Sequence, residues 1–328
     1  MSKPDLYPLL FEPILKPTLW GGRKLATALN KPLPPGELIG ESWEVSGVKD
    51  NISVVANGPL QGRLLTELMA TYKSDLLGGA VYERFPAEFP LLIKYIDANQ
   101  DLSIQVHPDD ELARQRHNSF GKTEMWYVID AEPGATLISG FNRPTSRAEY
   151  LEYFQSGRLM ELLNREQVAT GDVFFLPAGR VHTIGKGLLI AEIQQTSDIT
   201  YRIYDFDRVD KDGNKRQLHT EEALDAIDYH FYDNYKTSYD RNQPEVQLAQ
   251  CRYFTVNRLQ LTSRTARDYS ALDSFVVLMF LSGAGTLHTA AGDFPYAKGQ
   301  TYLLPATLNQ IAIAPGTSTT ALETYLPS

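Results

Sequence analysis

A short apolar segment that runs into a Pro/Gly turn occurs twice in this chain, and this repeat constrains the fold more than any other feature. The first copy, GDVFFLPA, begins at Gly171, and the second, GQTYLLPA, begins at Gly299, an offset of 128 residues. Upstream, ATL at 135–137 resembles GTL at 285–287, an offset of 150, so the second copy is shorter by 22 residues. Chance similarity is the alternative, because Gly and Pro are common turn residues. The repeat predicts two related β domains, the first with an insertion.

The rest of the chain favours a mainly β fold. Segments rich in β-branched and aromatic residues, such as 91–96, 125–129 and 188–193, alternate with Gly, Pro, Asn and Asp. Frequent short strands of this kind are typical of sandwiches and barrels. Helices are expected in three places: after His107 with Pro108 in the first turn, at 146–163, and after Thr220.

The helix expected around 146–163 has about the length of the insertion, and it opens with a capping-box pattern, Ser146 to Glu149. The polar stretch 233–245 is the best candidate for a linker. We therefore expect a first domain at 1–235 that carries this helical insertion, and a second domain at 236–328.

Composition excludes several classes of function. The net charge of -9, with no basic stripe, argues against nucleic acid as a partner. The single cysteine, Cys251, excludes an intramolecular disulfide framework and a cysteine metal site. The first 17 residues contain acidic residues and prolines and no long apolar core, and the longest apolar run, 275–281, is too short to span a bilayer. These features predict a cytoplasmic protein with no membrane partner.

The first copy of the repeat carries residues that suit a divalent metal. Gln105 and His107 are two residues apart, so on a strand they point to the same face. Glu124 begins the next predicted strand, and His182 follows the turn of the first copy. Imidazole and carboxylate ligands suit Zn, Fe, Mn or Ni, and this set leaves a position open for substrate. Gln105 is the weakest member, because an amide oxygen is an unusual ligand.

The second copy lacks these ligands. Five residues after Pro177 stands His182, whereas five residues after Pro305 stands Gln310. At the offset of 150, Ser274 takes the place of Glu124. The second domain is therefore predicted to be structural. The remaining histidines lie in polar or helical contexts and are given no ligand role: His117, His219, His230 and His288.

These motifs resemble the cupin superfamily and, within it, the short bacterial form of the type I phosphomannose isomerases. The second cupin motif is matched from Gly171 to His182. In the first motif Gln105 replaces a histidine and Glu124 comes 17 residues after His107, a departure that the phosphomannose isomerases share. Further matches extend over most of the chain: LWGG at 19–22, IGESWEVS at 39–46, QVHPDD at 105–110, GKTEMWY at 121–127 and DITYR at 198–202.

The resemblance implies two cupin-type β-barrels, a bicupin, with the large helical domain of the family reduced to the segment around 146–163. It implies one Zn²⁺ per chain, held by four ligands: Gln105, His107, Glu124 and His182. It further implies a small-molecule sugar phosphate as substrate and the interconversion of mannose 6-phosphate and fructose 6-phosphate through a cis-enediolate.

Three further residues match active-site positions of the family. Arg202 corresponds to a catalytic arginine, which would stabilise the oxyanion or hold the phosphate. Glu192, ten residues earlier, corresponds to a proposed base, and burial in an apolar barrel would raise its pKa. Lys122 would orient the substrate or transfer a proton. Four other side chains either line the pocket or pack against the barrel: Trp20, Trp43, Glu44 and Trp126.

Two alternatives remain open at this stage. The chain could be another metal-dependent cupin, either a dioxygenase or a sugar-phosphate isomerase of different specificity, although Gln105 in place of histidine counts against a dioxygenase. It could also be a sugar-binding bicupin without activity, against which the presence of Lys122, Glu192 and Arg202 argues. The sequence does not indicate the oligomeric state.

Overall fold

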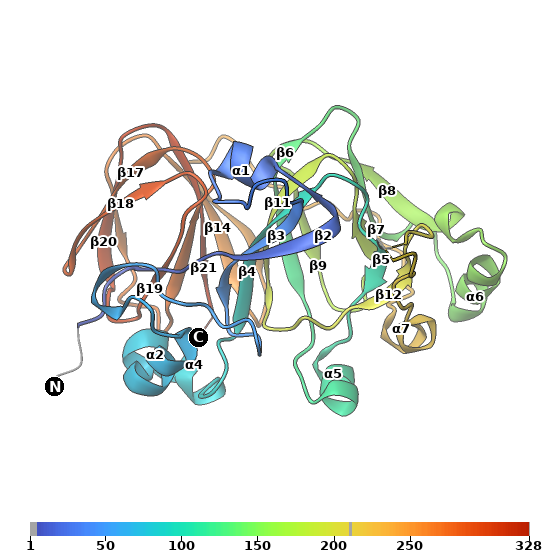
Figure 1. The fold of residues 1–328 in the computed structure, drawn as a ribbon, viewed down its shortest axis with the longest axis horizontal. Helices are drawn as coiled ribbons and strands as arrows, with labels where there is room; N and C mark the ends of the chain where they lie inside the picture. The colour runs from blue at the N-terminus through green and yellow to red at the C-terminus, as the bar shows by residue number, and fades with distance from the viewer. Residues whose placement is uncertain (1–4, 210–211, 328) are drawn as a thin grey trace.

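The computed structural model describes residues 5–209 and 212–327, and within them the expected mainly β architecture is confirmed. Twenty-one strands form four sheets, which are arranged as two β-rich halves side by side (Figure 1). The N-terminal half is coloured blue to yellow and the C-terminal half orange to red. Residues 1–4, which the expected first domain includes, lie outside the described residues.

Each half consists of one larger and one smaller sheet. In hydrogen-bonded order, the larger sheet of the N-terminal half contains β2 (Ile14–Gly22), β3 (Ile39–Ser46), β4 (Leu91–Ala98), β11 (Leu188–Gln195), β6 (Glu124–Ala131) and β9 (Val173–Leu176). Its smaller sheet contains β12 (Tyr201–Tyr204), β5 (Ile104–Val106), β10 (His182–Ile184), β7 (Thr136–Phe141) and β8 (Leu163–Gln167).

The C-terminal half has the same plan. Its larger sheet contains β1 (Leu9–Leu10), β19 (Thr301–Leu304), β16 (Val276–Phe280), β21 (Thr319–Tyr325), β14 (Thr255–Leu261) and β13 (Glu245–Gln250). Its smaller sheet contains β15 (Thr265–Asp268), β20 (Gln310–Pro315), β17 (Ala284–Thr289) and β18 (Gly292–Ala297). Because β1 pairs with β19, the first strand of the chain is hydrogen-bonded to the C-terminal half.

The internal repeat is present in the strand order. The order β9-β6-β11-β4-β3 in one half matches β19-β16-β21-β14-β13 in the other, and β8-β7-β10-β5 matches β18-β17-β20-β15. The glycines that open the repeat, Gly171 and Gly299, have φ values of 82° and 87°. Both copies therefore use the same left-handed turn, which glycine adopts without steric cost.

The insertion lies where the two copies differ in length. β7 and β8 are joined through α6 (Arg147–Gln155) and η2 (Leu159–Glu161), whereas β17 and β18 are joined by a tight turn at 290–291. Ser146 caps α6, because its side chain accepts a hydrogen bond from the amide of Glu149. The helix is shorter than the expected 146–163. It ends before Gly157, whose φ of 71° is incompatible with a continuing helix.

The three expected helices are only part of the helical content. α5 (Asp110–His117) and α7 (Thr220–Ala226) follow His107 and His219, but Asp109 caps α5, so Pro108 lies outside its first turn. The missed helices precede β4: α1 (Lys24–Leu29), η1 (Gly58–Leu60), α2 (Leu65–Tyr72), α3 (Ser74–Leu77) and α4 (Gly79–Arg84). The α-helices among them are four to eight residues long, which gives too few turns for a clear 3.6-residue period in the sequence. No helix in the described ranges is long and apolar enough to cross a membrane.

A shared apolar core joins the two halves, and strand alternation decides which side chains enter it. On β11, Leu189, Ala191 and Ile193 belong to a cluster that also contains residues of β14, β16 and β21. Leu188 and Ile190, which alternate with these residues along the strand, point the other way, into the space between the two N-terminal sheets. Glu192 shares that second face, so its carboxylate is directed into the N-terminal half.

Candidate metal centre and active-site pocket

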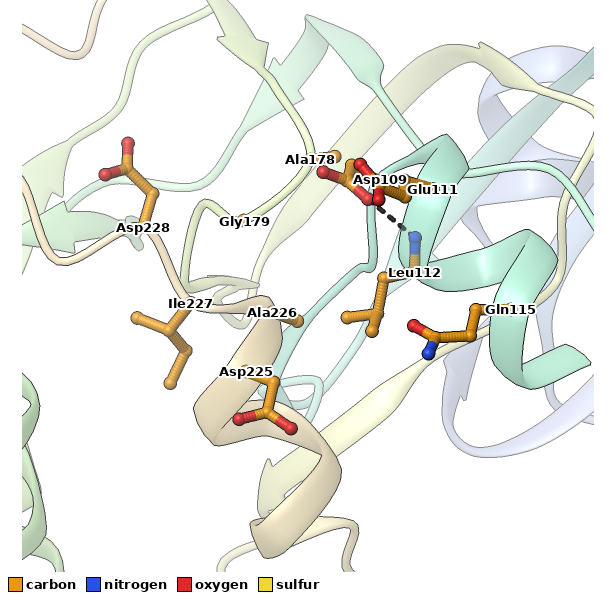
Figure 2. A pocket seen from close by; sticks show the side chains of 10 residues that line it. All are labelled: Asp109, Glu111, Leu112, Gln115, Ala178, Gly179, Asp225, Ala226, Ile227 and Asp228. Carbon is orange, nitrogen blue, oxygen red and sulfur yellow. Dashed lines mark hydrogen bonds between the residues drawn. The ribbon is translucent and has the colours of Figure 1, made fainter.

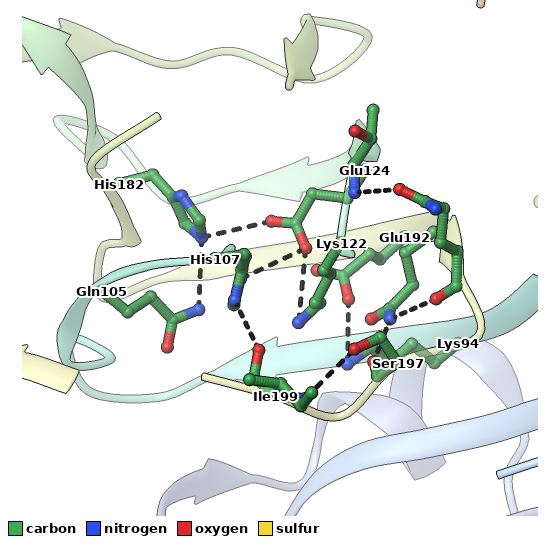
Figure 3. Close-up of polar contacts among 12 residues, drawn as sticks. Lys94, Gln105, His107, Lys122, Glu124, His182, Glu192, Ser197 and Ile199 are labelled. Atoms are coloured by element: carbon green, nitrogen blue, oxygen red, sulfur yellow. Dashed lines mark hydrogen bonds and ion pairs between the residues drawn. The ribbon is translucent and has the colours of Figure 1, made fainter. Parts of the chain in front are cut away.

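Three buried side chains meet between the two sheets of the N-terminal half (Figure 3). Glu124 is the first residue of β6, in the larger sheet, and His182 is the first residue of β10, in the smaller one. His107 follows β5 directly. One ligand atom from each residue lies within 4.8 Å of the others, and each residue is 1% exposed. The described part of the chain contains no other group of three such residues at this spacing.

Three of the four atoms that face one another in this cluster lack hydrogen-bond partners among the described residues. Nε2 of His182 lies 3.2 Å from Oε1 of Glu124, and Nε2 of His107 lies 3.6 Å from Oε2. Nε2 of His107 and both carboxylate oxygens of Glu124 are buried without a hydrogen bond from any described residue. Buried polar atoms are normally paired, so this cluster requires a further group between its members.

The backbone fixes the tautomer of both imidazole rings. Nδ1 of His107 lies 2.9 Å from the carbonyl oxygen of Ile199, and Nδ1 of His182 lies 2.8 Å from that of Arg180. A carbonyl oxygen only accepts, so each Nδ1 carries the proton and each Nε2 presents a lone pair to the cluster. This carbonyl support is the arrangement that orients metal-binding histidines in proteins.

Gln105 is brought to the same cluster by strand pairing. It lies opposite His182 on β5 and β10, and its Nε2 is 3.3 Å from Nε2 of His182. Directly opposed residues on neighbouring strands approach closely enough for such contact. Rotation of the amide about its last side-chain bond would turn Oε1 toward the cluster, where it would be the fourth oxygen or nitrogen ligand.

Burial gives these residues the electrostatics of a cation site. It raises the pKa of Glu124 to about 8, an effect to which the nearby Glu192 adds and which Lys122 and Lys94 reduce. It lowers the pKa of His182 to about 4, and it lowers the pKa of His107 well below the usual value. Both histidines are therefore neutral near pH 7. The pKa of Glu124 stays raised despite the two lysines, so a further cation between the ligands would favour its ionised form. The donor set thus fits a divalent metal.

A second row of polar groups lies beside the ligands. On adjacent strands β4, β11 and β6, Lys94, Glu192 and Trp126 occupy opposed positions. Nζ of Lys94 lies 2.9 Å from Oε1 of Glu192, and the indole of Trp126 donates to Oε2 at 2.7 Å. Lys122 lies two residues before the start of β6, and its Nζ is 3.4 Å from Oε2 of Glu124. Figure 3 shows Lys94, Lys122 and Glu192 beside the ligand cluster.

The expectation of a raised pKa for Glu192 is wrong. Burial does oppose ionisation of its carboxyl, but the charges of Lys94 and Lys122 and the hydrogen bonds from Lys94 and Trp126 outweigh it. The pKa of Glu192 is therefore below its ordinary value. Sequence reasoning missed Lys94, although a lysine in the apolar strand LLIKYI is itself a signal, because lysine is rarely buried without a partner.

These groups open onto a cavity of about 150 Å³. Gln105, Lys122 and Glu192 line it, together with Arg202, which is opposed to Gln105 on the neighbouring strand β12. The cavity walls also include Trp20, Trp43, Glu41, Lys94, Asp198 and Arg216. Glu44, considered for this wall from the sequence, instead pairs with Lys31 and lines a different cavity, between the two halves.

A larger hollow of about 380 Å³ lies on the outside of the N-terminal half (Figure 2). Four carboxylate side chains line it: Asp109, Glu111, Asp225 and Asp228. Figure 2 shows these acids around the ends of α5 and α7, and the lining contains none of the predicted ligands. Its negative charge would repel an anionic substrate, so size alone does not identify the active site.

Comparison with known proteins agrees with the arrangement of the site. The model of the phosphomannose isomerase type I catalytic domain matches residues 9–134, and that of the mannose-6-phosphate isomerase cupin domain matches residues 245–321. Mannose-6-phosphate isomerase ManA of Bacillus subtilis is 36% identical over 310 residues, which cover 93% of this chain and 95% of the relative. The mannose-6-phosphate isomerase of Streptococcus mutans is 35% identical over 303 residues, which cover 92% and 93%.

A solved structure shows the same fold over nearly the whole length. The crystal structure of the mannose 6-phosphate isomerase from Bacillus subtilis superimposes with a TM-score of 0.86 at 33% identity, over 96% of this chain and 99% of that one. Identity at this level over more than nine-tenths of both sequences establishes common descent. The chain therefore belongs to the type I phosphomannose isomerase family.

Proposed function

We propose that this chain interconverts mannose 6-phosphate and fructose 6-phosphate. The observation that carries the proposal is the buried cluster of His107, Glu124 and His182. Nε2 of His107 and both oxygens of Glu124 have no hydrogen bond from a described residue, and the cluster adjoins a cavity lined by Glu192, Lys122 and Arg202. The relatives named above are mannose-6-phosphate isomerases, and the chain matches them over almost their entire length.

We propose one Zn²⁺ per chain, held by Nε2 of His107, Nε2 of His182, the carboxylate of Glu124 and the amide oxygen of Gln105. When bound, the cation would polarise the substrate oxygens on the reacting carbons and stabilise negative charge there. The carbonyl oxygens of Ile199 and Arg180 hold the two imidazoles in the required tautomer.

Glu192 is the proposed base that moves a proton between C1 and C2. Its lowered pKa keeps it ionised at neutral pH, and therefore ready to accept a proton. Lys94 and Trp126 bind both carboxylate oxygens, so they fix the direction from which Glu192 approaches the substrate. Proton return to the adjacent carbon by the same group requires only a small movement of the substrate.

Arg202 and Lys122 are the proposed cationic partners of the substrate. Arg202 stays charged because guanidinium does not titrate in this pH range, although burial and the neighbouring Arg216 lower its pKa. It lies on the strand beside Gln105, where it would stabilise the enediolate oxygens. Lys122 reaches Glu124 and lines the same cavity, and would orient the sugar.

For the architecture, we propose a bicupin with a catalytic domain at 1–235 and a degenerate cupin domain at 236–328. The matching strand order of the two halves supports two related barrels. The cupin-domain match at 245–321 supports the division near residue 236.

A coupled assay of fructose 6-phosphate formation, before and after treatment with a chelator, tests the proposed function. We expect turnover that is lost with the metal and restored by Zn²⁺. Sugar-phosphate binding without turnover would indicate a binding protein instead. Oxygen consumption would indicate a dioxygenase, and turnover of a different aldose phosphate alone would redefine the substrate.

A further inference from the structure

Lys122 and Glu124 flank Thr123, whose backbone is bound by a side chain of another strand. The amide of Thr123 donates to Oε1 of Gln195, the last residue of β11, at 2.9 Å, and its carbonyl oxygen accepts from the Gln195 amide at 3.1 Å. Nζ of Lys122 and Oε2 of Glu124 are 3.4 Å apart, so both side chains lie on the same side of the chain. A shift of Thr123 would therefore move both active-site groups together.

Asp110, the last residue of the QVHPDD segment, fixes the orientation of the Gln195 side-chain amide. Oδ1 of Asp110 accepts from Nε2 of Gln195 at 2.9 Å and from the backbone amide of Gly121 at 3.0 Å. An ionised carboxylate only accepts, so Nε2 of Gln195 faces Asp110 and Oε1 is left to accept from Thr123. Without this carboxylate the amide group of Gln195 would be free to turn over, which would place a donor against the Thr123 amide.

The other oxygen of the Asp110 carboxylate is bound from the C-terminal half. The hydroxyl of Tyr253 and Nη2 of Arg252 each donate to Oδ2 at 2.6 Å, and both residues lie in the turn at 251–254 between β13 and β14. Arg252 is 69% exposed, so solvent weakens its contribution, whereas Tyr253 is partly buried. Burial opposes ionisation of Asp110, but the hydrogen bonds from Tyr253 and Gln195 hold its pKa below the ordinary value. The carboxylate therefore joins the two halves.

We propose that Tyr253, Asp110 and Gln195 are positioning residues, through which the C-terminal half sets the position of Lys122 and Glu124. None of the three lines the active-site cavity, so they act on the site only through the residues that they hold. The half that was predicted to be structural thus contributes to the arrangement of the active site. The assignment rests on the proposed isomerase function for the reaction that is served, but not for the placement of the two groups.

The test uses substitutions that remove hydrogen bonds and keep side-chain size. In zinc-saturated enzyme, Gln195→Met should lower kcat by about tenfold to a hundredfold, because small displacements of catalytic groups are costly. Tyr253→Phe should lower kcat by about threefold to tenfold, the effect of one lost hydrogen bond, and KM should change little in both variants. Tyr239→Phe is the matched control and should keep the wild-type kcat, since its hydroxyl binds the carbonyl oxygen of Gly171 and not this path.

Two further measurements do not depend on turnover. Competition with a chelator should show that Gln195→Met binds Zn²⁺ about tenfold to a hundredfold more weakly than the wild type, the usual effect of removing a group that supports a metal ligand. In metal-free protein, the Thr123 amide should exchange with solvent faster in Tyr253→Phe than in Tyr239→Phe. Asp110→Asn keeps an oxygen that can accept from Gly121 and Gln195, so it should retain more activity and more zinc affinity than Asp110→Ala.

The outcomes separate this inference from the proposed function. Wild-type kcat and zinc affinity in Gln195→Met would overturn the inference. Equal losses in Tyr253→Phe and Tyr239→Phe would also overturn it, as would a loss of activity that only follows the loss of folded protein in urea. A wild type that isomerises no sugar phosphate would refute the isomerase proposal alone, because zinc affinity and exchange of the Thr123 amide would still test the positioning path.

Discussion

Each half of the molecule buries a glutamate among its strands, and the two carboxylates differ in how they are satisfied. Glu124 in the N-terminal half and Glu323 in the C-terminal half are each 1% exposed. The oxygens of Glu124 receive no hydrogen bond from any described residue. Those of Glu323 accept from Asn257 at 2.9 Å, from Tyr269 at 2.7 Å and from Arg267 at 2.9 and 3.0 Å.

The difference shows how one strand order can hold either a binding site or a closed core. Arg267 provides the C-terminal half with a permanent internal cation, so the negative charge of Glu323 is balanced by the chain itself. In the N-terminal half Lys122 approaches Glu124 only to 3.4 Å and the pKa of Glu124 stays raised, so a bound cation would complete the balance. A buried carboxylate that accepts no hydrogen bond on either oxygen, facing an imidazole nitrogen that also has none, therefore distinguishes the N-terminal half.

The largest effect is expected where the ligand cluster is broken. His182→Ala should lose the metal and lower kcat/KM by about a thousandfold or more, because the cation would supply several kcal/mol of charge stabilisation. His288→Ala is the matched control, since His288 lies on β17 in the C-terminal half and its ring hydrogen-bonds to Asp293. Metal analysis and the isomerase assay are applied to both variants. Equal loss of activity in the two would contradict the assignment of the metal site to the N-terminal half.

A smaller loss is expected when the proposed base is changed without touching a ligand. Glu192→Gln should retain the metal but lower kcat by roughly a hundredfold to ten-thousandfold, the usual contribution of a general base. Deuterium incorporation at C1 and C2 from D₂O, followed by NMR, should stop. Lys94 keeps Glu41 as a partner at 3.3 Å, so the fold should survive. Exchange at the wild-type rate would exclude Glu192 as the base and make Lys122 the next residue to test.

Both this site and the repeat were only partly predictable from the sequence. The spacing of Gln105 and His107 and the turn before His182 are local patterns in the sequence, and the structure brings these residues to one cluster. The partners of Glu192 are not local: Lys94 and Trp126 reach it through pairing of β4, β11 and β6, and no motif contains all three. The sequence therefore does not predict the lowered pKa of Glu192. The apolar strand indicates burial, but it does not indicate the nearby positive charges of Lys94 and Lys122.

The same limit applies to the C-terminal half. Gln310 in place of His182 indicates a changed site, but the expected match of Ser274 to Glu124 is wrong by two residues. Glu124 pairs with Leu176, whereas Val276 pairs with Leu304, the residue at the repeat offset of 128, so an apolar side chain takes the place of the carboxylate. That Arg267 and Tyr269 would instead satisfy Glu323 depends on the alignment of β14, β15 and β21, which residue spacing alone does not specify.

A change of stability rather than activity is expected for the second carboxylate. Glu323→Gln should lower the free energy of unfolding by about 1–3 kcal/mol, because Arg267 and Tyr269 lose part of their hydrogen bonding, and should leave kcat unchanged. In metal-free protein Glu124→Gln should destabilise less, since its carboxylate accepts no hydrogen bond and only the 3.4 Å ion pair to Lys122 would be lost. Urea unfolding of both variants measures this contrast. Equal destabilisation in the metal-free state would remove the distinction between the two glutamates.

The smallest effect concerns the turn that opens each copy of the repeat. Asp172 accepts a hydrogen bond from the amide of Ala169 at 3.0 Å, and in the second copy Gln300 accepts one from the amide of Ala297 at 2.8 Å. Only Asp172 adds ion pairs, to Lys236 at 2.7 Å and to Arg241 in the segment that joins the halves. Asp172→Asn should therefore keep the turn, as Gln300 does, and lose the ion pairs.

The pH dependence distinguishes these two contributions. Burial would raise the pKa of Asp172, but the hydrogen bonds from Lys236 and Ala169 and the charge of Arg241 hold it below the ordinary value. A carboxyl with a lowered folded-state pKa stabilises the fold fully above its unfolded pKa, near 3.9, and this contribution is lost as pH falls through the folded value.

The free energy of unfolding of the wild type should thus exceed that of Asp172→Asn by about 1 kcal/mol at pH 7, and the difference should shrink below about pH 4. The value is modest because Lys236 and Arg241 are partly exposed. Asp240→Asn, in the same segment, is the control: hydrogen bonds from Asn242 and Gln243 also lower the pKa of this exposed carboxyl, so the variant shows how much pH dependence arises without an ion pair. A constant difference from pH 7 to pH 3.5 would mean that Asp172 acts through the shape of the turn, as in the second copy, and not through its charge.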